Sequence, residues 1–212
     1  MVDSIIFDLD GTLWDTTHVG AMIWSESAAR HGVDLQVTVE QLKGLYGLPT
    51  EVIAKELFPD APEQVALDIM AESCENQCPY LEKDGGILFP YFFETLNDLR
   101  KNYRLFIVSN CQEGYIQCFI KGNRLEGYFE DFEYPGRTGQ SKAENIRLIM
   151  NRNQLKKSIY VGDTAGDSHA AKEAGIPFVF ARYGFGTVEK FDAVIDSLKE
   201  LPGLPLLRQR FL

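Results

Sequence analysis

The chain has 212 residues, a formal net charge of −10 at pH 7 and a hydrophobic share of 45%. These values suit one folded core with room for a smaller inserted part, and they exclude a chain that is disordered throughout. The excess of acids disfavours a phosphate backbone as partner, so we expect no nucleic acid. No apolar run approaches the roughly 20 residues that cross a bilayer, so we expect no membrane segment. The N-terminus does not resemble a signal peptide.

Four cysteines are too few to form a disulfide scaffold in a chain of this length. Cys74 and Cys78 fall on one face of a predicted helix, where zinc could bind. No His or further Cys nearby completes a tetrahedral set, so we favour buried thiols. We therefore expect a cytoplasmic protein.

Four short apolar runs predict buried strands, and helical patterns lie between them. The predicted strands are Ser4–Phe7, 105–108, 158–161 and 177–181, and the predicted helices among them are 91–102, 143–150 and 170–174. Continuous apolar strands alternating with helices indicate a parallel sheet that is covered on both faces. The predicted fold class is α/β, with a Rossmann-like core of three layers.

A helical block interrupts this alternation soon after the first strand. Helices are predicted at 17–31, 39–44, 51–57 and 63–81, with prolines between them and no strong strand pattern. Such an insert would lie above the carboxyl end of the first strand, where open α/β sheets bind ligands. We predict a catalytic core of residues 1–14 and 86–212 and an all-helical cap of residues 15–85.

Polar side chains follow three of the predicted strands, and a lysine begins a helix between the last two. The carboxyl ends of parallel strands meet at one edge of the sheet, so these groups could share one crevice. The candidates are Asp8, Asp10, Ser109, Asn110, Lys142, Asp163 and Asp167.

Asp8 and Asp10 stand two apart, and their carboxylates would point the same way in an extended chain. They could hold a hard cation, or they could form an ordinary acidic turn after a strand. The pair by itself leaves both interpretations open. A calcium-binding EF-hand loop is excluded, because Leu13 and Val19 replace the glycine and glutamate that it requires.

Lys142 follows Ser141 and precedes Glu144, which together form the pattern of a helix capping box. The pattern places Lys142 in the first helical turn, where the helix dipole disfavours a cation. A broken local preference of this kind often marks a functional residue, and a solvated surface lysine is the alternative.

The polar residues after the strands predicted at 158–161 and 105–108 also have two interpretations each. Asp167 could cap a helix together with Thr164, whereas Asp163 at the end of a buried strand more plausibly holds a cation. Ser109 and Asn110 could cap the next helix, or they could direct a hydroxyl and backbone N–H groups at an oxyanion.

Taken together, these motifs resemble those of the haloacid dehalogenase superfamily in order and spacing. DLDGTL at residues 8–13 resembles the first motif, Ser109 the second, Lys142 the third and GDTAGD at residues 162–167 the fourth. A helical cap between the first two motifs is typical of the phosphoglycolate phosphatase-like branch. One departure is Ala143, where that branch usually carries proline.

The resemblance implies a Mg²⁺-dependent phosphatase in which Asp8 attacks phosphorus and becomes an aspartyl-phosphate. It implies Mg²⁺ bound by the side chains of Asp8 and Asp163 and by the backbone carbonyl of Asp10. Asp10 would also protonate the leaving oxygen and later activate water. Further implied roles are phosphate binding by Ser109, Asn110 and Lys142, and support of these groups by Thr12 and Asp167.

Three other functions use related folds or residues, and the sequence disfavours each. A dehalogenase would need neither Asp10 nor a metal cluster. A β-phosphoglucomutase-like phosphomutase typically has a Gly-x-x-Arg cap loop, and residues 47–50 here read GLPT. A phosphoreceiver signalling module places its acidic pair before the phosphorylated aspartate and lacks a large cap.

The expected substrate is a small phosphorylated metabolite, with phosphoglycolate a candidate by resemblance alone. Selectivity should lie in the cap near residues 46–50. For Trp24 we favour packing inside the cap over substrate contact, and for His18 a surface position. The expected assembly is a monomer or a homodimer.

Overall fold

Strand β1 (Ser4–Phe7) lies inside a six-stranded parallel sheet of order β5-β4-β1-β6-β7-β8. The computed structural model describes residues 1–208. All four residues of β1 are buried, because strands pair with both of its edges and helices cover both of its faces. The other strands are β4 (Arg104–Val108), β5 (Asp131–Glu133), β6 (Ser158–Gly162), β7 (Phe178–Ala181) and β8 (Ala193–Ile195).

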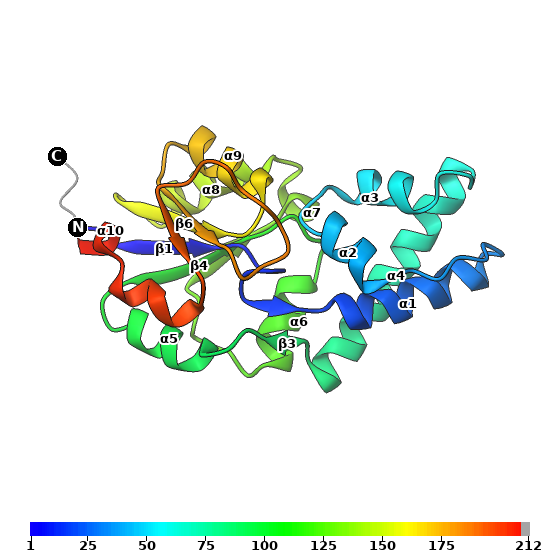
Figure 1. Cartoon of the computed structure of the whole chain (residues 1–212), viewed down its shortest axis with the longest axis horizontal. Helices are drawn as coiled ribbons and strands as arrows, with labels where there is room; N and C mark the ends of the chain where they lie inside the picture. The colour runs from blue at the N-terminus through cyan, green and yellow to red at the C-terminus, as the bar shows by residue number, and fades with distance from the viewer. Residues whose placement is uncertain (209–212) are drawn as a thin grey trace.

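Helices lie on both faces of the sheet (Figure 1), and alternate side chains of β1 enter two separate hydrophobic cores, one on each face. Ile5 and Phe7 pack in the core that also contains side chains of α5 (Phe92–Leu99) and α6 (Tyr115–Gly122). Ile6 packs in the opposite core, which is completed by α8 (Lys142–Arg152) and α9 (Ala165–Ala174). This three-layer α/β architecture confirms the predicted fold class.

The four predicted strands are present, but the sequence patterns missed β5, β8 and α6. The two missed strands have three residues each, which is too short for a pattern to emerge. Short helical segments were also unpredicted: α7 (Pro135–Thr138), a 3-10 helix (Leu198–Gly203) and α10 (Pro205–Arg208).

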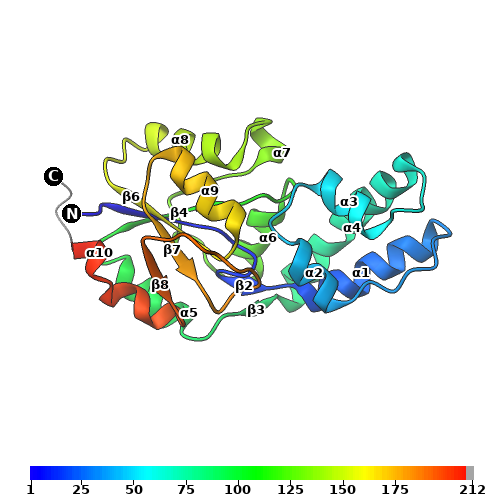
Figure 2. The ribbon, with the colours of Figure 1, turned by 45° about the horizontal axis from the view of Figure 1, so that its top comes forward.

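The first four helices of the chain form the cap, which extends beyond one end of the sheet (Figure 2). They bury an apolar cluster of their own around Trp24, Leu42 and Ile69. The sequence predicted each of these helices to within a few residues at each end. They are α1 (Thr17–Arg30), α2 (Val39–Leu45), α3 (Thr50–Leu57) and α4 (Glu63–Asp84). The exact domain boundaries at residues 15 and 85 stay a prediction.

The chain enters and leaves the cap through a two-stranded antiparallel sheet that the sequence did not predict. In it, β2 (Trp14–Asp15) pairs with β3 (Ile87–Leu88). Helix α4 of the cap also packs against α6 of the core. These contacts hold the cap beside the carboxyl edge of the parallel sheet. Within residues 1–208, no helix combines the length and apolar character needed to cross a bilayer.

We predict that Ile6→Ala lowers the free energy of unfolding by about 2–5 kcal/mol, because it leaves a cavity beneath α8 and α9. Urea denaturation followed by circular dichroism measures this change. Val52→Ala, at an exposed position on α3, is the control and should change it by less than about 0.5 kcal/mol. Equal effects of the two substitutions would contradict the assignment of Ile6 to the core.

Candidate active site

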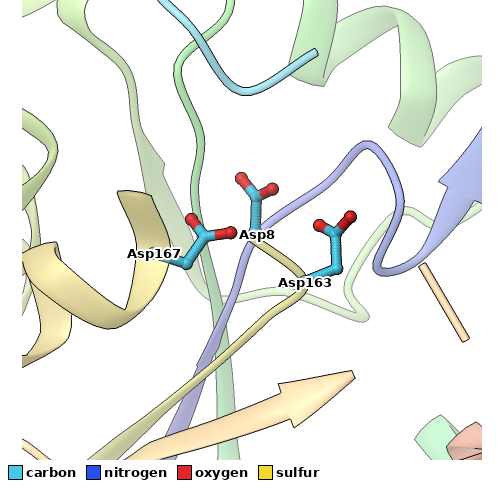
Figure 3. A group of neighbouring side chains, drawn as sticks. All are labelled: Asp8, Asp163 and Asp167. Carbon is cyan, nitrogen blue, oxygen red and sulfur yellow. The ribbon is translucent and has the colours of Figure 1, made fainter. Parts of the chain in front are cut away.

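Three aspartates meet at the carboxyl edge of the sheet (Figure 3). Asp8 follows β1 and Asp163 follows β6, and these strands are direct neighbours in the sheet. Asp167 comes from the first turn of α9. One carboxylate oxygen of each lies within 4.8 Å of the others, and all three residues are buried. The structure thus brings together acids separated by more than 150 residues in the sequence.

Lys142 joins two of these acids from the start of α8. Its Nζ donates hydrogen bonds to Asp8 Oδ1 at 3.0 Å and to Asp167 Oδ1 at 2.6 Å. The residue is only 7% exposed, so the alternative of a solvated surface lysine is wrong. Burial disfavours its ammonium, but Asp167 and Asp8 outweigh that effect and raise the pKa of Lys142. The predicted capping box of Ser141 and Glu144 is present as well.

Asp167 makes two sets of hydrogen bonds, one that caps α9 and one with Lys142. Its Oδ2 accepts hydrogen bonds from the backbone N–H and the hydroxyl of Thr164, which makes the capping box of α9. Its Oδ1 accepts from Lys142. Asp167 therefore caps α9 with one carboxylate oxygen and holds Lys142 with the other.

The charge balance of the cluster fits a divalent cation. Burial, followed by repulsion from Asp167, raises the pKa of Asp8 to about 6, although Lys142 opposes the shift. Burial and the charges of Asp167 and Asp8 also raise the pKa of Asp163 well above its ordinary value. One ammonium cannot neutralise three buried carboxylates, and an all-oxygen donor set suits a hard cation. Among residues 1–208, this is the one such cluster of acids, histidines or cysteines.

Close backbone contacts hold Asp163 in position. Gly11 has a φ of +77°, and a Cβ there would lie 2.2 Å from Asp163 Oδ2. A Cβ at Gly184 would lie 2.3 Å from the Cβ of Asp163. Asp163 also accepts hydrogen bonds from the Thr12 hydroxyl at 3.2 Å and from the Phe185 N–H at 2.8 Å. Thr12 therefore supports an acid of the site directly, and the loop after β7 flanks the crevice.

The carboxylate of Asp10 does not join the other three. Its Oδ1 accepts hydrogen bonds from Tyr115 at 2.9 Å and from Thr16 at 3.1 Å. These two hydroxyls hold one oxygen of the Asp10 carboxylate, and a cation shared by Asp8 and Asp10 stays a prediction. Burial, followed by the charge of Asp8, raises the pKa of Asp10 to about 7. No sequence signal identified Thr16 or Tyr115 as partners.

Ser109 and Asn110 follow β4 beside the acids. The Ser109 side chain is buried beside the carboxylate of Asp8 and opposes the rise in the pKa of Asp8. Asn110 Nδ2 donates to the backbone carbonyl of Gly47 in the cap at 3.0 Å. The alternative role as a helix cap is wrong, because α6 begins only at Tyr115 with Gly114 at its N-cap.

The cap segment from Tyr46 to Thr50 lines a small cavity beside Asp10, as the expected place of substrate selection requires. Trp24 is buried in the apolar cluster of the cap and also borders this cavity. His18 is exposed, as predicted. The four cysteines are free thiols; Cys118 is buried and the other three are half-buried.

The model of the family described as haloacid dehalogenase-like hydrolase matches residues 5–181 of this chain. The chain belongs to this family. The match confirms the resemblance that the motifs indicated, and with it the assignment as a hydrolase.

Two curated relatives match nearly the whole chain. One is the phosphoglycolate phosphatase of Vibrio parahaemolyticus, 26% identical over 93% of this chain and 93% of its own length. Another is the plasmid phosphoglycolate phosphatase of Cupriavidus necator, 28% identical over 95% of this chain and 92% of its own. Both names denote phosphoric monoester hydrolases, the class of enzyme that the sequence predicted.

Solved structures share the fold, including the helical cap. A haloacid dehalogenase-like family hydrolase from Streptococcus pneumoniae has a TM-score of 0.81 at 23% identity, with 95% of this chain and 97% of that chain covered. A predicted phosphoglycolate phosphatase from Haemophilus somnus has a TM-score of 0.84 at 18% identity, with 95% and 97% covered.

We predict that a divalent cation stabilises this protein more at pH 8 than at pH 5. In the metal-free protein the raised pKa values of Asp8 and Asp163 favour folding at low pH. That contribution is complete below the unfolded pKa near 3.9 and is lost as the pH rises through about 6, the folded pKa of Asp8. A bound cation offsets the loss by compensating the ionised carboxylates.

Thermal unfolding with and without MgCl₂ measures the effect at both pH values. The increase in Tm should be larger at pH 8 by roughly 3 °C or more. Asp163→Asn should abolish the difference, and the exposed Asp60→Asn should preserve it. Equal increases at the two pH values would refute the coupling between cation and carboxylates.

Proposed function

We propose that this protein is a Mg²⁺-dependent phosphatase that hydrolyses a small phosphorylated metabolite through a phosphorylated Asp8. The observation that carries the proposal is the buried carboxylate of Asp8, held by Lys142 beside Asp163 at the sheet edge. Phosphate esters resist attack because their oxygens are negative, so a catalyst must neutralise charge while it aligns a nucleophile. The site combines both requirements, and the phosphatase names of the relatives support the assignment.

In this proposal, Asp8 attacks phosphorus and the ester oxygen leaves as an alcohol. The hydrogen bond from Lys142 to Oδ1 fixes the orientation of the attacking carboxylate. Water then cleaves the aspartyl-phosphate, which releases phosphate and restores Asp8.

Asp10 would serve as the acid in the first step and the base in the second. A group that must give up and regain a proton near neutrality works best with a pKa near the working pH. Burial raises the pKa of Asp10 to about 7, and Tyr115 and Thr16 hold its Oδ1 in place. Its other oxygen is left to face the leaving group.

The remaining predicted site residues receive supporting roles. Ser109, Asn110 and Lys142 would bind the oxygens of the transferring phosphoryl group. Asp8, Asp163 and the backbone carbonyl of Asp10 would hold Mg²⁺, which supplies positive charge to those oxygens. Thr12 and Asp167 would keep Asp163 and Lys142 in place, as their hydrogen bonds suggest.

The phosphomutase alternative finds no support in the cap loop. Residues 47–50 lie beside the site, where Gly47 meets Asn110, and contain no arginine. Interconversion of hexose phosphates without release of free phosphate would favour the phosphomutase over the phosphatase. The cytoplasmic location and the monomeric or homodimeric state stay predictions.

We predict that Asp8→Asn reduces the kcat for p-nitrophenyl phosphate with Mg²⁺ by at least about 1000-fold, because an amide is a poor nucleophile. Phosphate release measures the loss. Tm should stay equal or rise, since a buried like charge is removed, so unfolding would not explain the result. Near wild-type turnover would rule out Asp8 as the nucleophile.

We predict that excess EDTA removes more than about nine-tenths of the activity and that added MgCl₂ restores it. Without a cation, Asp8 and Asp163 repel each other and the phosphate. The assay is phosphate release before chelation, after it and after MgCl₂ is added back. Full activity in EDTA would contradict the proposed metal requirement.

A further inference from the structure

A small cavity separates the cap from the sheet edge, and Asp10 forms part of its wall. Its volume is about 40 Å³, which is room for about three or four water-sized groups. A larger cleft of about 780 Å³ shares Thr50, Met70 and Asn110 with the cavity wall and reaches Lys142. The cavity therefore lies where the organic half of a phosphate ester would sit when Asp10 protonates its leaving oxygen.

The wall of this cavity contains an acid, Asp10, and no lysine, arginine or histidine among the described residues that line it. The adjoining cleft adds two more acids, Glu51 and Glu113. Its one cation within the described part of the chain is Lys142, which Asp8 and Asp167 already pair. A negative charge on the organic half of the substrate would find no counterion here.

Gln77 of α4 offers a neutral hydrogen-bond donor instead. The residue lines the cavity and is only 2% exposed. Trp24 Nε1 donates to Gln77 Oε1 at 3.4 Å, and because an indole N–H can only donate, it holds the carbonyl oxygen on that side.

Within residues 1–208, the amide nitrogen of Gln77 has no hydrogen-bond partner at normal distance and angle. Nε2 is buried and makes no hydrogen bond of normal geometry, although the Tyr46 hydroxyl lies nearby. A buried donor without an acceptor costs free energy, which a ligand oxygen in the cavity would recover.

We infer that the organic half of the substrate is small and uncharged, with a hydroxyl or carbonyl oxygen that accepts a hydrogen bond from Gln77. This inference rests on the proposed phosphatase function and narrows its substrate class. A carboxylate in the same place would be buried beside Asp10 without a cation, which is unfavourable even where neutral donors surround it. The cavity therefore selects against the carboxylate of phosphoglycolate.

Two matched esters test this inference on the wild-type enzyme with Mg²⁺. 2-Hydroxyethyl phosphate differs from 2-phosphoglycolate in carrying a hydroxymethyl group in place of the carboxylate. We expect its kcat/KM to be higher by at least about tenfold. An equal or higher kcat/KM for 2-phosphoglycolate would overturn the inference.

A positive charge introduced into the cavity should change the preference between the two esters. Gln77→Lys should shift the kcat/KM ratio of the two esters toward phosphoglycolate by at least about tenfold. Thr50→Lys tests the same point at a half-buried position if the first variant fails to fold. Val52→Lys places the same charge on the exposed face of α3, outside the cavity, and should leave the ratio unchanged.

Lys43 provides the opposing test. Its ammonium lies 5.9 Å from the ring centre of Phe185 and is outside the cavity wall. A wild-type preference for phosphoglycolate that Lys43→Gln abolishes would show that Lys43 supplies a counterion, and would overturn the inference. Absence of turnover with any ester, p-nitrophenyl phosphate included, would instead refute the phosphatase function itself.

Discussion

The buried ammonium of Lys142 is the interaction on which the site depends. It joins Asp8, just after the first strand, to Asp167 on a late helix, and so connects segments that are far apart in the sequence. Without it, three carboxylates at the sheet edge would repel one another in a medium that screens poorly. With it, the cluster is still short of positive charge. That remaining deficit of positive charge fits a divalent cation, which in the proposed function would in turn bind the phosphoryl group.

The cap is the part of the chain that we expect to select the substrate. The β2–β3 pair and the packing of α4 on α6 place the cap over the sheet edge, and the bond from Asn110 to Gly47 closes one side. In the proposed function, the donors and acids of the core would bind the phosphoryl group. The organic half would enter the cavity that residues of the cap and the core line together, where Asp10 is the one charged residue among those described. Asp10 would thus stand where the phosphate chemistry meets the selection of the substrate.

Local patterns predicted the main strands, most helices and the capping boxes of α8 and α9, because strand period and helix capping depend on neighbouring residues. The edge strand β5 was not predicted, since two of its three residues are acids and it shows no apolar run. Arg152 bonds both Asp131 and Glu133, so their charge is compensated by a residue about 20 positions away. Helix α6 was not predicted either, although its buried face packs against the sheet and α4.

The sequence by itself determined which groups stand at the strand ends and the order in which they occur, and that order identified the family. The tertiary structure decided where each side chain points. It turned the Asp10 carboxylate toward Tyr115, which is 105 residues away, and it buried Gln77 with an unused donor beside Asp10. Neither outcome follows from local preference, because the partners of a buried polar group are chosen by how distant elements pack.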